Sequence, residues 1–219
     1  MKILLLGEYS NFHNTLKKGL TDLGHHVVLI GRKDGFKSYP VDINLDPKIL
    51  SKVPFKYLRS LIFRILKFDI ASFEMLYYFF RNRKEFKGYD CVQLINEFPI
   101  KTTPSLDKFL LKYIFKHNKN VYVSACGDDV IYINYILQSK LPYHILTPYL
   151  KDKSLKKHFI YSLEYLSASH KRLSDYVLTH VINVIPADMD YYMAYKNHPK
   201  TSPLIPFPID AEVNKYIPM

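Results

Sequence analysis

Glycine and cysteine are scarce in this chain of 219 residues, and both shortages exclude classes of protein. With only 7 glycines the chain is neither a low-complexity sequence nor an enzyme built on glycine-rich loops, so any phosphate site must use few of them. The two cysteines, Cys91 and Cys126, form no C-x-x-C pair and no disulfide framework, which argues against a cysteine-based zinc site. We therefore expect a protein of a reducing compartment, with the cytoplasm as its location.

Long apolar runs are missing as well. The run at residues 3–6 ends at Gly7 and Glu8, which is too short for the core of a signal peptide, and no run approaches the 18 residues of a membrane-spanning helix. What the chain does have is 48% hydrophobic residues, including 19 tyrosines and 14 phenylalanines. This composition suits one large globular domain with a substantial core.

Positive charge is in excess and is concentrated in one segment. The chain carries 31 lysines and arginines against 20 acidic residues, a net charge of +11. Nine basic and three acidic residues fall within residues 52–87, so this segment alone carries +6. Such a charge favours polyanionic partners, namely nucleic acid, anionic lipid headgroups or phosphorylated substrates.

The order of apolar runs predicts an α/β fold. Runs at residues 2–6 and 26–30 flank a segment, 11–23, in which Phe12, Leu16 and Leu20 recur at helical spacing. This βαβ unit implies a parallel sheet. We expect further strands at residues 91–95, 121–125, 204–207 and either 176–178 or 181–185, with helices at 55–68, 71–84, 106–117 and 156–173. The fold class is a Rossmann-like, doubly wound parallel sheet with an inserted basic helical hairpin.

Ligands of such sheets bind at the carboxyl ends of the strands, which singles out the residues that follow each expected strand. These candidates for a substrate cleft are Gly7, Tyr9, Asn11, Asn96, Glu97, Cys126, Gly127, Asp128 and Asp129. A dinucleotide fingerprint requires G-x-G-x-x-G after the first strand and an acidic residue after the second. The chain has a single glycine and then Arg32 and Lys33, so we do not expect an NAD-dependent enzyme.

Several short motifs, taken in order, carry a resemblance to a known family. They are Lys2-Ile3-Leu4-Leu5-Leu6-Gly7, His13, Leu20-x-x-Leu23-Gly24-His25-x-Val27, Val121-x-Val123-Ser124-Ala125-Cys126-Gly127-x-Asp129 and Ile205-Pro206-x-Pro208-Ile209-Asp210. Together they resemble the amino-terminal half of GT-B glycosyltransferases, most closely family 4, whose members are retaining enzymes that assemble surface polysaccharides.

The resemblance implies an enzyme of two domains, one for the acceptor and one for the donor. Residues 1–202 would form the acceptor-binding domain, and residues 203–219 a final strand and a linker toward a carboxyl-terminal donor domain that the sequence lacks. The implied partners are a glycan or lipid-linked acceptor and that donor domain, with a nucleotide sugar as donor substrate and no other cofactor. His13 is the residue that the resemblance places at the reacting sugar. The chain by itself is not expected to complete the reaction.

The candidate residues also have structural interpretations, which the sequence leaves open. His13 could be an ordinary residue of the first helical turn, and Asp128 and Asp129 could cap the helix that follows them. Cys126 replaces the histidine or aromatic residue that family members often have at this motif. Asp188-x-Asp190 has the spacing of a divalent-metal motif, but capping of a helix by Asp188 is the simpler interpretation, and we expect no metal site.

The helix expected at residues 55–68 has a basic polar face. Lys56, Arg59, Arg64 and Lys67 fall within an arc of about 140° that contains no acidic residue. Such a helix suits the surface of an anionic membrane, which predicts attachment to the inner face of the cell membrane. The alternative is packing within the domain, through Phe73, Leu76, Tyr77 and Phe80 of the next helix.

A second hypothesis from another class is a non-catalytic, basic module that binds a membrane or another polyanion on a Rossmann-like scaffold. Nucleic acid is the weaker partner in that hypothesis, because the sequence has no RRM, helix-turn-helix or OB pattern. We therefore expect no nucleic acid among the partners.

Overall fold

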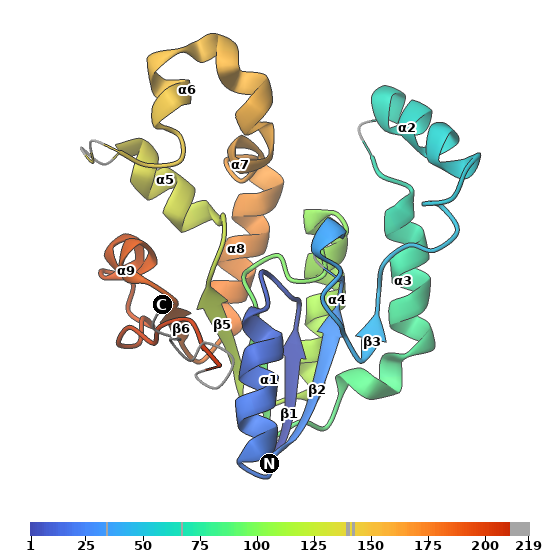
Figure 1. The fold of residues 1–219 in the computed structure, drawn as a ribbon, viewed down its shortest axis with the longest axis vertical. Coiled ribbons are helices and arrows are strands. Elements are labelled where there is room, and N and C mark those ends of the chain that lie inside the picture. The colour runs from blue at the N-terminus through green and yellow to red at the C-terminus, as the bar shows by residue number, and fades with distance from the viewer. Residues whose placement is uncertain (34, 67, 139–140, 142, 211–219) are drawn as a thin grey trace, which may run out of the picture.

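The computed structural model describes residues 1–210 except 34, 67, 139–140 and 142. Its strands form one six-stranded parallel sheet in the order β3-β2-β1-β4-β5-β6 (Figure 1). They are β1 (Lys2–Leu6), β2 (His26–Gly31), β3 (Ile43–Asn44), β4 (Cys91–Leu94), β5 (Val121–Ala125) and β6 (Val184–Pro186). This order is that of Rossmann folds, so the predicted α/β fold class is confirmed.

The strand β1 lies in the middle of the sheet, paired to β2 on one side and to β4 on the other. Its side chains alternate between two apolar layers. Ile3 and Leu5 pack with Leu29 of β2 under α1 (Phe12–Asp22). Leu4 and Leu6 face the larger core on the opposite side. A strand buried on both faces explains why the sequence here is a continuous apolar run.

The larger core is covered by three helices. Met75 and Phe79 of α3 (Ala71–Arg81), Leu110 and Ile114 of α4 (Pro104–His117), and Val177 of α8 (Ala168–His180) all pack in it. The helix α4 begins where the sequence dictates, because Thr103 accepts a hydrogen bond from the Leu106 amide.

The remaining elements are helices and 3-10 turns. They are η1 (Gly35–Lys37), α2 (Phe55–Leu66), η2 (Arg83–Phe86), α5 (Val130–Gln138), α6 (Thr147–Lys151), η3 (Lys153–Phe159), α7 (Ile160–Glu164) and α9 (Met189–Tyr195). Figure 1 shows α2 and the stretch from α6 to α7 projecting from the sheet on the side where its strands end.

Two expected elements near the carboxyl terminus are wrong in detail. The single helix at 156–173 is instead η3, α7 and α8, with a break in which Ser167 caps α8 by accepting a hydrogen bond from the His170 amide. The alternative strand at 176–178 is helical, because α8 continues to His180. The other alternative, 181–185, contains the start of β6.

The final strand expected at residues 204–207 does not form. One isolated bridge joins Val184 to Thr201, and residues 202–210 are irregular. Pro203, Pro206 and Pro208 lack the amide hydrogens that a ladder needs, which accounts for the difference. This segment packs across α1, with Phe207 against Phe12 at 4.9 Å between ring centroids and Lys18 paired to Asp210 at 3.1 Å. Residues 211–219 of the expected linker lie outside the described residues.

Candidate functional site

A cleft of about 430 Å³ opens at the carboxyl ends of β1, β4 and β5. The strand order reverses between β1 and β4, and ligands of open parallel sheets bind at such a point. The cleft is rich in aromatic side chains and contains two lysines and one carboxylate. Its lining residues are Tyr9, Ser10, Lys37, Asn96, Lys101, Cys126, Gly127, Asp128, Tyr161, Tyr165, Tyr191 and Phe207.

The turn between β1 and α1 is built on close backbone contacts. Gly7 has a φ of +88°, and its amide donates to the Ile30 carbonyl at 2.8 Å. A Cβ at Gly7 would lie 2.3 Å from Cγ2 of Ile95 and 3.0 Å from the carbonyl oxygen of Pro99. Gly7 is buried and does not line the cleft. Its role in this structure is to let the chain turn in a space with no room for a side chain.

A carboxylate occupies the amino-terminal end of α1. Glu8 is buried, and its Oε2 accepts hydrogen bonds from the backbone amide and the side-chain amide of Asn14, at 2.9 and 2.8 Å. In dinucleotide-binding folds the pyrophosphate takes this place. Because the Glu8 carboxyl group already occupies this place, no phosphate can take it, which is consistent with the missing glycine fingerprint.

His13 lies in the first turn of α1, as the sequence predicts. Its side chain is fully buried, its Nδ1 donates to the Gly7 carbonyl at 2.6 Å, and it does not line the cleft. Burial lowers the pKa of His13 to about 4, so the ring is neutral at physiological pH. Its Nε2 has no hydrogen-bond partner among the described residues. In this structure His13 holds the turn at Gly7, and its expected contact with the reacting sugar stays a prediction.

Beyond β4, one expected residue faces the cleft and the next is buried behind it. Asn96 lines the cleft, and its Oδ1 accepts from the Phe98 amide at 2.8 Å. Glu97 points into the protein, where its Oε1 accepts from the Val130 amide at 2.8 Å. Burial and the nearby Asp129 carboxylate raise the pKa of Glu97, which favours its neutral form. Glu97 thus tethers the start of α5 and does not line the cleft.

Beyond β5 also, some of the expected residues line the cleft and one does not. Cys126, Gly127 and Asp128 line the cleft, and the Gly127 amide donates to the Tyr191 hydroxyl at 2.8 Å. Asp128 accepts a hydrogen bond from the Ser162 hydroxyl of α7. Asp129 instead caps α5, accepting from the Tyr132 amide at 2.7 Å, which confirms the capping interpretation for this residue.

Asp129 also anchors α9. Its Oδ2 accepts from the Tyr195 hydroxyl at 2.9 Å, and burial raises the pKa of its carboxyl to about 7. This residue and Glu97 form a buried acidic pair that joins β4, α5 and α9 behind the cleft wall.

The two lysines of the cleft reach it from different loops. Lys101 has a φ of +60°, and its loop is fixed by Asp107, which accepts from the amides of Ile100 and Lys101 at 3.1 Å and of Thr102 at 2.9 Å. Its Nζ lies 3.9 Å from the ring centroid of Tyr9. Lys37, from the loop after β2, donates to the Ser10 hydroxyl at 2.6 Å. Ser10 and Lys101, which both line the cleft, have a positive φ, and such a backbone persists only where the surrounding structure holds it in place.

The sequence-based candidates thus fall into two groups. Tyr9, Asn96, Cys126, Gly127 and Asp128 come together in the cleft, whereas Gly7, Asn11, His13, Glu97 and Asp129 do not line it. Asn11 lies in an adjoining hollow of about 530 Å³ between α1 and residues 207–210. The cleft residues that the sequence did not reveal are Ser10, Lys37, Lys101, Tyr161, Tyr165, Tyr191 and Phe207.

The D-x-D motif of residues 188–190 lies at the start of α9. Asp188 caps α9, and its Oδ1 accepts from the amides of Asp190 at 2.9 Å and Tyr191 at 3.1 Å. The capping interpretation is confirmed. Within the part of the chain that the structure describes, no group of three or more His, Cys, Asp or Glu side chains could hold a metal ion.

The apolar side chains of the basic helix α2 are exposed to solvent. Phe55, Tyr57, Leu61, Phe63 and Ile65 are exposed. The alternative in which this face packs against the next helix is wrong for these exposed residues of α2, because α3 leaves its own Phe73, Tyr77 and Phe80 exposed and turns Leu76 into the core. Only Phe68, beyond the end of α2, contacts Phe73 among the described aromatic pairs, at 5.2 Å between ring centroids. In the described residues no helix is long and apolar enough to cross a membrane.

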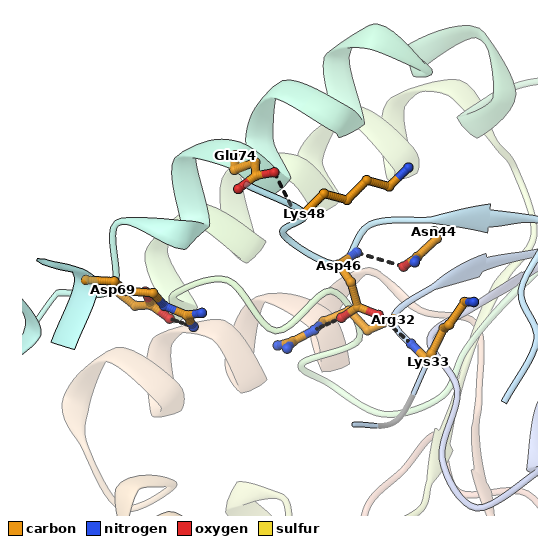
Figure 2. A network of polar contacts seen from close by, with 8 residues as sticks. Arg32, Lys33, Asn44, Asp46, Lys48, Asp69 and Glu74 are labelled. Atoms are coloured by element: carbon orange, nitrogen blue, oxygen red, sulfur yellow. Dashed lines mark hydrogen bonds and ion pairs between the residues drawn. The ribbon is translucent and has the colours of Figure 1, made fainter. Parts of the chain in front are cut away.

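Polar contacts hold α2 to the domain. Arg59 forms two hydrogen bonds with Asp69, at 2.7 and 2.6 Å, so it is an anchor of the helix and not a free surface cation. The loop before α2 is fixed by Glu74 of α3, which accepts from the amides of Lys48, Ile49 and Leu50, and Figure 2 shows the Lys48 contact beside the Arg32–Asp46 ion pair.

Of the four membrane residues expected from the sequence, two are at the surface. Lys56 and Arg64 are exposed, Arg59 is paired, and Lys67 lies outside the described residues.

Comparison with known proteins leaves the family of the chain open. No model of a known protein family and no curated protein matches it. Among solved structures it is similar to the 3-alpha-hydroxysteroid dehydrogenase from Pseudomonas sp. B-0831 complexed with NADH, at 13% sequence identity and a TM-score of 0.32, over 91% of this chain and 78% of that one. The chain itself has a Rossmann-like α/β fold, as its strand order shows.

Proposed function

We propose that this chain is the acceptor-binding domain of a retaining GT-B glycosyltransferase that transfers a sugar from a nucleotide sugar to a glycan or lipid-linked acceptor in surface polysaccharide synthesis. The observation that carries the proposal is the lining of the cleft at the switch point of the sheet. Four tyrosines and Phe207 surround it together with Asn96 and Asp128.

This lining matches the chemistry of a sugar. The C–H faces of a pyranose ring pack on aromatic rings, while its hydroxyls need oriented acceptors and donors. Asp128 and Asn96 supply such groups, and each is fixed by a hydrogen bond, from Ser162 and the Phe98 amide respectively. Lys37 and Lys101 add positive charge, which suits an acceptor that carries a phosphate.

The donor is proposed to bind elsewhere. Glu8 places a carboxylate at the amino-terminal end of α1, where a diphosphate would otherwise find bare amides. This favours a donor site on the other half of the enzyme, as the resemblance implies. His13 has no part in the proposed mechanism beyond fixing the turn, because it is buried away from the cleft.

Removal of the exposed Tyr161 ring from the cleft tests the proposal. Saturation-transfer NMR of the 219-residue chain is expected to detect oligosaccharide binding, and Tyr161→Ala to weaken it about fivefold, since an aromatic contact is worth about 1 kcal/mol. Tyr143→Ala is the matched control, because Tyr143 is equally exposed but lies outside the cleft. Micromolar binding of UDP or GDP sugars, or equal loss in both variants, would contradict the proposal.

We also propose that α2 attaches the protein peripherally to an anionic membrane. This second proposal rests on its exposed apolar residues, which stand beside exposed Lys52, Lys56 and Arg64. Apolar side chains can enter the headgroup boundary while the cations remain among lipid phosphates.

Neutralising these cations is expected to weaken binding to phosphatidylglycerol vesicles. The triple change of Lys52, Lys56 and Arg64 to Gln removes about 1 kcal/mol per residue, or roughly a hundredfold in partitioning. Vesicle sedimentation at low salt measures it. The control neutralises Lys84, Lys87 and Lys119, which are exposed and precede β4 or β5, at the amino-terminal ends of the strands. Equal weakening in both triple variants would show a nonspecific charge effect and refute the proposal.

A further inference from the structure

A second projection, which is also basic and apolar, lies beyond the carboxyl ends of the strands, as α2 does. It runs from α6 through η3 to α7 and is formed by residues 147–164. Four lysines, Lys151, Lys153, Lys156 and Lys157, are exposed on it. The acidic residues of this stretch are Asp152 and Glu164, so the lysines outnumber them.

Apolar side chains are exposed on this projection as they are on α2. Leu150 at the end of α6 and Ile160 and Tyr161 at the start of α7 are all exposed. Phe159 and Leu163 of the projection pack against a small core of Tyr132, Ile133, Ile136 and Leu146, which holds the segment to α5. The exposed set is therefore separate from the residues that fold the segment.

The two projections flank the cleft. Figure 1 shows α2 on one side and the stretch from α6 to α7 on the other, both beyond the ends of the strands where the cleft lies. The cleft and the second projection share Tyr161 of α7, and Tyr165, which directly follows the projection, also lines the cleft. The second projection therefore forms part of the cleft wall.

We propose that both projections contact one anionic phospholipid bilayer, so that the cleft opens toward the headgroups and takes an amphiphilic acceptor from the membrane plane. The inference rests on the proposed membrane attachment of α2. Complementary charge is the argument for this occupant: each projection presents lysines or arginines beside exposed apolar side chains, and anionic headgroups over acyl chains match both. Two contacts in one molecule also reinforce each other, since the second forms without a new encounter.

The absence of tryptophan provides a direct test. Single tryptophans at Tyr57 of α2, at Leu150 of α6 and, as control, at the exposed Leu23 beyond the end of α1 each report on one place. With phosphatidylglycerol vesicles, the emission of Tyr57→Trp and Leu150→Trp is expected to shift to the blue and to be quenched by brominated lipids, while Leu23→Trp stays unchanged. Exchange of the four lysines for Gln is expected to weaken vesicle binding at least tenfold.

Each outcome decides between the two proposals. A shift for Tyr57→Trp alone would overturn the two-point contact and leave the attachment through α2 intact. No shift at either position would overturn both. A shift at all three positions, Leu23 included, would mean adsorption without a defined orientation and would also overturn the inference. Vesicles of neutral phosphatidylcholine are expected to give no shift at any position.

Discussion

Gly7→Ala is expected to destabilise the protein by about 4 kcal/mol, because the new methyl group meets two obstacles at once. First, a φ of +88° is unfavourable for any residue that has a Cβ. Second, the Cβ would lie 2.3 Å from Cγ2 of Ile95, a residue that is fully buried. The carbonyl of Pro99 at 3.0 Å closes the other direction. Urea denaturation of the wild type and the variant measures the difference.

Gly24→Ala is the matched control. Gly24 has nearly the same backbone, with a φ of +81°, but nothing lies within 4 Å of a Cβ built there. This variant is expected to lose only about 1 kcal/mol, the cost of the left-handed conformation alone. Equal losses at the two positions would show that the crowding around Gly7 relaxes without cost.

The βαβ unit around Gly7 was predictable because its signals are local. Apolar runs closed by Gly7 and Gly31, with Leu16 and Leu20 at helical spacing between them, determine two strands and a helix without reference to the rest of the chain. The strand predicted at residues 204–207 was wrong. The apolar side chains there suggested a strand, but Pro206 and the neighbouring prolines lack the amide hydrogens that a strand needs. The break before α8 was not predicted, because the capping residue Ser167 lies within a continuous helical pattern of apolar residues.

The cleft was predictable only where it follows the strands. Tyr9, Asn96 and Asp128 lie at carboxyl ends of parallel strands, which is a rule of topology. Tyr161 and Phe207 reach the same cleft from segments whose position depends on tertiary packing, the first through α7 and the second through the irregular segment that crosses α1. His13 was predictable in its position along the chain only. The motif gives its place in the first helical turn, but the orientation of the ring depends on the carbonyl of Gly7.

His13→Asn is expected to change how stability depends on pH. The amide of asparagine can take the place of Nδ1 and donate to Gly7, but it does not titrate. In the wild type, burial lowers the pKa of His13 to about 4, whereas the unfolded chain has the ordinary value near 6.5. As the pH falls through this window, the unfolded chain binds a proton that the folded protein refuses, so the wild type loses stability.

The shift of about 2.5 pKa units corresponds to about 3 kcal/mol. The free energy of unfolding of the wild type minus that of His13→Asn is therefore expected to fall by this amount between pH 7.5 and pH 4. Other buried groups that titrate there, such as Asp107 and Asp129, are common to both proteins and cancel in the difference. Urea denaturation across this pH range gives the difference directly. A difference that stays constant would mean that the folded protein accepts a proton on His13 near pH 6.5, and that Nε2 reaches solvent or substrate in solution.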